Sequence, residues 1–112
     1  MVNKISSWNI GKVKITRIVE MERTGPMFVV PDAIPENIIK MPWLQPHFSD
    51  EKGNTIVSVH ALIIETPEKL IIVDTCLGND KERHIPAWNK LQTKFLEDLK
   101  KSGYKTEDID TV

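Results

Sequence analysis

Apolar and polar residues alternate in the first part of the chain. Between Trp8 and Glu20, in WNIGKVKITRIVE, mostly β-branched apolar residues take turns with Lys, Thr and Arg. A period of two residues with this composition predicts a half-exposed strand or hairpin, with its turn at residues 9–12 around Gly11. The alternation slips near Arg17, which indicates a bulge or a strand end.

A second pair of strands is predicted in the middle of the chain. Residues 57–65 form one strand and residues 69–74 the other, and Thr66, Pro67 and Glu68 form the turn between them. The second strand and residues 61–64 are continuously apolar. Such runs predict burial on both faces of a sheet, as in a layered α/β or αββα domain.

The spacing of apolar residues changes to that of a helix over residues 87–102. One face of this helix would carry Trp88, Leu91, Phe95, Leu96 and Leu99. Pro86 suits the start of a helix, and Gly103 suits the position just after its end. Residues 106–109 then predict a short turn or helix start, and residues 110–112 lead into a further strand.

The segment from residue 21 to residue 50 is rich in proline. It contains Pro26, Pro31, Pro35, Pro42 and Pro46. This spacing excludes a long helix or a central strand, although a helical turn fits residues 35–40. The segment is also too apolar for a solvated linker. We therefore expect an ordered loop packed on the domain, or a lid over a site.

Composition and charge narrow the class of protein. The chain has 112 residues, of which 40% are hydrophobic and 28% charged, so residues 1–112 are expected to lie within a single domain. The net charge of -1 gives no electrostatic reason for binding nucleic acid or an anionic membrane. No apolar run approaches the roughly 18 residues of a membrane span. A single cysteine and the lack of a secretory signal favour a cytoplasmic protein.

Two candidate reactive groups follow the second predicted strand of the central pair. Asp74 lies where α/β domains place their sites, or it caps the next turn through its side chain. Cys76 has two interpretations. It could act as a nucleophile with His60 or His84 as its base, or it could fill space as a small buried side chain. The histidines His47, His60 and His84 match no local metal-ligand motif, and His60 within a strand favours a packing role.

Several stretches together resemble one family. These are SVHALIIETPEKLIIVDTCLGNDKER, IPAWNKLQTKFLEDLKKSGYKTEDIDTV, ITRIVE and MPWLQPHFSDEKG. They are similar to the N-terminal part of metallo-β-lactamase (MBL)-fold hydrolases of a lactonase-like bacterial group. The resemblance implies an α+β fold, an αββα sandwich. The chain would supply an N-terminal partial fold of antiparallel or mixed strands plus one long helix.

The resemblance also implies an activity. Members of this family use one or two zinc ions to activate water for attack on a lactone, ester or amide carbonyl of a small-molecule substrate. Their main metal ligands lie in an H-x-H-x-D-H motif after the strand that DIDTV begins, so no ligand maps onto this chain. Asp74 maps onto an acid that helps to order the ligand loop beside the metal.

The segment of residues 21–50 maps onto a region that borders the substrate pocket, which makes Trp43 and Phe48 candidate pocket-lining residues. We expect the complete protein to be a zinc enzyme. The 112-residue chain alone should be inactive, bind no zinc tightly and leave an apolar face open.

Two other functions remain as alternatives. One is a non-catalytic module that pairs with itself, as a homo-oligomer through the exposed apolar face, or with a partner chain. The other is a thiol-dependent enzyme that uses Cys76.

Overall fold

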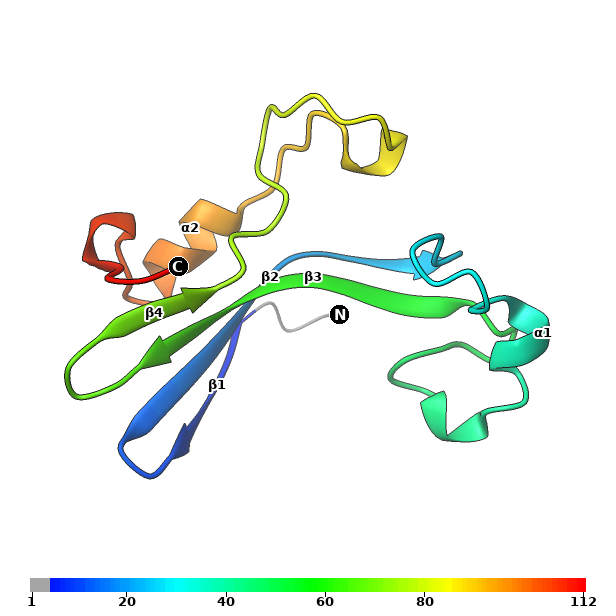
Figure 1. Cartoon of the computed structure of the whole chain (residues 1–112), viewed down its shortest axis with the longest axis horizontal. Helices are drawn as coiled ribbons and strands as arrows, with labels where there is room; N and C mark the ends of the chain where they lie inside the picture. Colours follow the sequence, from blue (N-terminus) through cyan, green and yellow to red (C-terminus); the bar gives the residue numbers. More distant parts are fainter. Residues whose placement is uncertain (1–4) are drawn as a thin grey trace. The chain divides into compact units, whose positions relative to one another are not determined.

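The computed structural model describes residues 5–112, and these residues contain one four-stranded sheet with the order β1-β2-β3-β4 (Figure 1). The strands are β1 (Ile5–Ile10), β2 (Val13–Gly25), β3 (Thr55–Glu65) and β4 (Leu70–Val73). The two α-helices are α1 (Pro35–Ile38) and α2 (Phe95–Lys101). Short 3-10 helices lie at Pro42–Leu44, Pro86–Trp88 and Thr106–Asp108. No helix within residues 5–112 has the length and apolar character needed to cross a membrane.

The first hairpin, β1–β2, confirms the alternation seen near the N-terminus. Its antiparallel register runs without interruption from Ile5 opposite Ile18 to Ile10 opposite Val13, and Gly11 in the turn has a φ of 59°. The predicted strand end at Arg17 is wrong, because β2 continues through it to Gly25, and the pairing of β2 with β1 contains no bulge at Arg17. Neighbouring side chains in a strand point to opposite faces, and here three in a row, residues 18–20, are buried. Burial on both faces explains why apolar and polar residues stop alternating at this point of the sequence.

The second hairpin, β3–β4, is also confirmed. Its antiparallel register runs from Leu62 opposite Val73 to Glu65 opposite Leu70. In the turn, the hydroxyl oxygen of Thr66 accepts hydrogen bonds from the backbone N–H groups of Glu68 and Lys69, at 3.2 and 2.8 Å. This short polar side chain adds to the backbone bond of the turn, in which the N–H of Thr66 donates to the oxygen of Lys69 at 2.9 Å.

The hydrophobic core lies on one face of the sheet. Its buried members come from β2, β3, β4, α2 and the segment after α2, and they are Ile18, Ala61, Ile63, Ile72, Phe95, Leu99 and Tyr104. The predicted burial of residues 61–73 on both faces is therefore wrong for the chain described. Val73 on the opposite face is 46% exposed, since α2 covers the core face alone.

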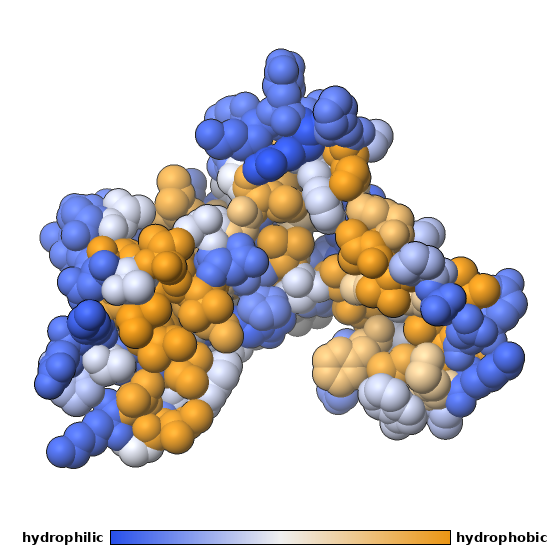
Figure 2. All heavy atoms as spheres, in the orientation of Figure 1, coloured by the Kyte–Doolittle hydropathy of each residue, from blue (hydrophilic) through white to orange (hydrophobic). Residues whose placement is uncertain are grey.

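That opposite face carries exposed apolar side chains. Trp8 and Ile10 of β1 lie on it, because their partners Ile15 and Val13 alternate with the core residue Ile18 on β2. Their exposed fractions are 43% and 62%. Figure 2 shows hydrophobic residues gathered over the strands in the lower left of the view. Only one sheet is present in residues 5–112, so the αββα sandwich stays a prediction.

The long helix predicted over residues 87–102 is wrong. Only Phe95–Lys101 is α-helical, and Lys90 has a φ of 48°, which no α-helix contains. The reason is competition from the loop after β4. The backbone N–H of Lys90 donates to the oxygen of Lys81 at 2.8 Å, and the N–H of Asp80 donates to the oxygen of Leu91 at 3.1 Å.

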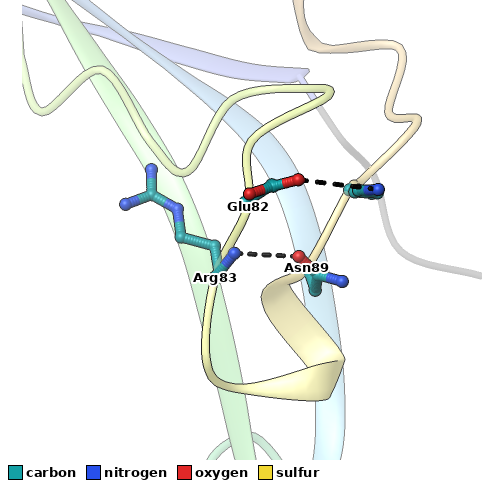
Figure 3. A network of polar contacts seen from close by, with 4 residues as sticks. Glu82, Arg83 and Asn89 are labelled. Atoms are coloured by element: carbon teal, nitrogen blue, oxygen red, sulfur yellow. Dashed lines mark hydrogen bonds and ion pairs between the residues drawn. The ribbon is translucent and has the colours of Figure 1, made fainter.

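Side chains strengthen this non-helical pairing. The N–H of Arg83 donates to the side-chain oxygen of Asn89 at 2.8 Å, and Glu82 faces the ammonium group of Lys90 at 3.8 Å (Figure 3). The amide of Asn79 pairs with the backbone of Thr93 in both directions, at 2.9 and 2.7 Å. Backbone groups that a helix would use internally are thus bound to another segment.

The chain divides into two compact units, one made of the residues up to Met21 with Val59–Val112, the other of Glu22–Ser58. In the second unit, the predicted helical turn is α1, but residues 21–25 belong to β2 instead of the loop. Several large apolar side chains of this unit are exposed: Phe28, Val29, Val30, Ile34, Ile39, Trp43 and Phe48. The role of residues 21–50 as a packed loop or lid, and the single-domain boundary, stay predictions.

The last residues form an isolated bridge with β4. Thr111 forms a parallel bridge with Ile71, and the N–H of Ile72 donates to the oxygen of Thr111 at 2.9 Å. The carboxylate of Asp110 also accepts a hydrogen bond from the N–H of Leu70 at 2.7 Å. Residues 110–112 therefore lie beside β4 and run in the same direction, and the further strand stays a prediction.

Candidate functional site

The loop that follows β4 has an unusual backbone. Asp74, Cys76 and Asp80 have φ values of 68°, 65° and 59°, in the left-handed region, and Gly78 has a φ of 81°. This region is costly for residues other than glycine and persists where the surroundings hold the chain in place. Contacts with other residues must therefore hold this loop in its conformation.

Asp74 makes a local contact within the loop. Its side chain is exposed, and its Oδ1 accepts a hydrogen bond from the N–H of Cys76 at 2.7 Å. This is the turn-capping contact that the sequence indicated for an aspartate here. The other proposed role of Asp74, ordering a ligand loop beside a metal, stays a prediction.

The residue that holds the loop from outside is Glu20 on β2. Its side chain is 3% exposed. One carboxylate oxygen accepts a hydrogen bond from the N–H of Leu77 at 2.8 Å, and the other accepts from the N–H of Gly78 at 3.0 Å. A buried carboxylate requires such partners. Sequence reasoning missed Glu20, although an acid at the end of the apolar stretch ITRIVE was a usable signal.

Cys76 has the wrong electrostatic environment for a nucleophile. Burial, followed by the negative charges of Glu20 and Asp74, raises the pKa of its thiol from 9.0 to about 12. A catalytic cysteine needs the opposite shift, from a nearby cation or a helix N-terminus. The thiol stays protonated near neutral pH, which argues against the thiol-enzyme alternative and favours a packing role.

The described side chains do not fit a zinc site. His47 and His84 are exposed in loops, and His60 lies within β3. No group of three or more His, Cys, Asp or Glu side chains in residues 5–112 is arranged to hold a metal ion. The three histidines of this part of the chain therefore form no metal centre with one another.

An open cavity of about 280 Å³ lies beside the loop. Its polar lining includes Glu20, Thr75, Asn79 and Thr93, and its apolar lining comes mainly from β4, α2 and residues 109–112. A second cavity of about 170 Å³ lies within residues 25–54. Trp43 and Phe48 line neither cavity and are 72% and 60% exposed, so their pocket-lining role stays a prediction.

Comparison with known proteins gives matches to solved structures. No protein-family model and no curated protein matches the chain. One similar structure is AidC, a dizinc quorum-quenching lactonase in complex with a product. The TM-score is 0.62 and the identity 18%, over 94% of this chain and 33% of AidC. The other is AbOPH, a hydrolase in the beta lactamase superfamily. The TM-score is 0.60 and the identity 21%, over 98% of this chain and 35% of AbOPH.

These matches define the fold of the chain as part of the metallo-β-lactamase fold, and they confirm the predicted resemblance at the level of the fold. The chain spans about a third of the length of each solved structure.

Proposed function

We propose that the chain is the N-terminal part of a zinc-dependent hydrolase of the MBL superfamily that acts on a lactone, ester or amide bond of a small molecule. The observation that carries the proposal is the likeness of 94% and 98% of the chain to two hydrolases, one of them a dizinc lactonase. At 18% and 21% identity this likeness concerns the fold, so the activity requires a direct test.

Within such an enzyme, this chain would supply the framework beside the metal. Thr111 forms a parallel bridge with Ile71, so a strand that continued from Thr111 would run beside β4, and a loop after it would emerge near Asp74. The zinc ligands would come from an H-x-H-x-D-H motif in that loop. Asp74 would then help to orient the ligand loop by hydrogen bonding.

Zinc titration and hydrolase assays test the proposal. The substrates are N-hexanoyl-homoserine lactone, 4-nitrophenyl acetate and nitrocefin, which represent a lactone, an ester and an amide. The 112-residue chain alone should show neither stoichiometric zinc binding nor turnover. The full-length protein encoded by the gene should hydrolyse at least one substrate in a zinc-dependent way. Tight zinc binding with turnover by residues 1–112, or a zinc-loaded full-length protein inactive on all three substrates, would contradict it.

A second candidate function is a non-catalytic module that pairs through its open sheet face. The supporting observation is the exposure of Trp8, Ile10 and Val73 on the face opposite α2. Sedimentation velocity separates the two candidates for the 112-residue chain. A compact monomer at all concentrations excludes pairing with itself, whereas a concentration-dependent dimer that Trp8→Ser disrupts supports it.

A further inference from the structure

We infer that Glu20 is a positioning residue, whose carboxylate sets the conformation of the loop after β4 and thereby the place of Asp74. The inference deepens the proposed function and, as far as catalysis is concerned, rests on it. Glu20 is 57 positions before Leu77 and 58 before Gly78 in the sequence, and its carboxylate accepts a hydrogen bond from the backbone N–H of each.

The geometry of the contact explains why this one side chain is effective. Two successive backbone N–H groups donate to the two oxygens of one carboxylate, at 2.8 and 3.0 Å. Two hydrogen bonds to a planar group fix orientation as well as position, and bonds to a charged acceptor are stronger than neutral ones. Because Glu20 is buried on a strand of the sheet, its carboxylate is a rigid anchor for the loop.

The anchored residues are linked to Asp74 by further contacts. The oxygen of Leu77 accepts a hydrogen bond from the guanidinium group of Arg83 at 2.8 Å, so this residue is held on both its N–H and its C=O. Leu77 follows Cys76, whose N–H is bound by the carboxylate of Asp74 at 2.7 Å. A shift of residues 77 and 78 would therefore move Asp74 as well.

The same contacts distinguish positioning from catalysis. Both oxygens of Glu20 are already bound by backbone N–H groups, so the carboxylate does not stand free as a general base or a metal ligand. Glu22 provides a matched control, because it is an exposed glutamate two residues further along β2.

Hydrogen exchange in the full-length protein tests the anchor without any assay of activity. In the wild type, the amides of Leu77 and Gly78 should exchange more slowly than that of the exposed Thr75. Glu20→Gln replaces one acceptor oxygen by a donor, so exchange of these two amides should become about tenfold faster or more. Glu22→Gln should leave both unchanged. Exchange in the wild type as fast as at Thr75, or no change in Glu20→Gln, would overturn the inference.

Kinetics in the same protein test the consequence for catalysis. With 4-nitrophenyl acetate or the homoserine lactone as substrate, Glu20→Gln should lower kcat about tenfold with little change in KM. Ile63→Val, a core variant that leaves the Glu20 carboxylate in place, should lower the Tm without this change in kcat. An active enzyme whose kcat is unaffected by Glu20→Gln refutes the positioning role. A protein inactive on every substrate refutes the proposed function instead, and the exchange result still decides the anchor.

Discussion

The hydroxyl oxygens of Thr16 and Tyr104 lie 3.1 Å apart, although the two residues are 88 positions apart in the sequence. Tyr104 also donates its hydroxyl proton to the carboxylate of Glu65 at 3.2 Å. Since a tyrosine has one such proton, Thr16 is the donor in the first bond. The tyrosine thereby connects β2, β3 and the segment after α2 at the edge of the core.

Removing the Tyr104 hydroxyl should destabilise the protein. Tyr104→Phe leaves the buried hydroxyl of Thr16 without this partner, so the free energy of unfolding should fall by about 1–3 kcal/mol. Urea unfolding of Tyr104→Phe, Thr16→Val and the double variant measures the coupling between the two side chains. The double variant should lose less than the sum of the single losses, whereas additive losses would mean that the bond contributes nothing.

Two glycines should respond differently to the same substitution. Gly53 has a φ of 81°, and a Cβ atom there would lie 2.7 Å from the backbone oxygen of Pro35. Gly11 has a φ of 59° with nothing within 4 Å of such an atom. Gly11→Ala should therefore cost about 1 kcal/mol for its backbone conformation alone. Gly53→Ala should cost clearly more, as measured by urea unfolding, and equal costs would contradict the close approach to Pro35.

Whether a glycine at position 90 raises or lowers the free energy of unfolding tests the absence of a long helix over residues 87–102. Lys90 has a φ of 48°, which glycine adopts more readily than lysine. The substitution also removes the ion pair with Glu82, but that pair is exposed and contributes little, so Lys90→Gly should raise the free energy of unfolding by about 0.5–1 kcal/mol. Lys100→Gly, within α2, should lower it by about 1 kcal/mol. If both variants are destabilised alike, residues 87–94 are helical after all.

The thiol of Cys76 should make stability depend on alkaline pH. Its pKa is raised from 9.0 to about 12, chiefly by burial, so the folded state holds the proton more tightly than the unfolded state does. The protonated thiol therefore contributes its full stability below pH 9, and this contribution is lost as the pH rises through about 12. The difference in unfolding free energy between wild type and Cys76→Ser should therefore shrink from pH 8 to pH 11. A constant difference would contradict the raised pKa.

Both hairpins were predictable because their information is local. The alternation of apolar residues around Gly11 and the turn at Thr66 act between neighbours in the chain, and the structure contains both. The prediction of a helix over residues 87–102 was wrong because the deciding contacts are not local. The apolar spacing from Trp88 to Leu99 is a local signal, but Asn79 and Lys81 compete for the same backbone from outside the segment.

The site shows the same division. Local patterns in the sequence predicted the two hairpins and placed Asp74 at the end of β4. The hydrogen bonds between Glu20 and the loop after β4, and the burial that raises the pKa of the Cys76 thiol, arise only in the folded chain. Strand patterns depend on neighbours along the chain, whereas a buried charge and its hydrogen-bond partners depend on segments that meet only when the chain folds.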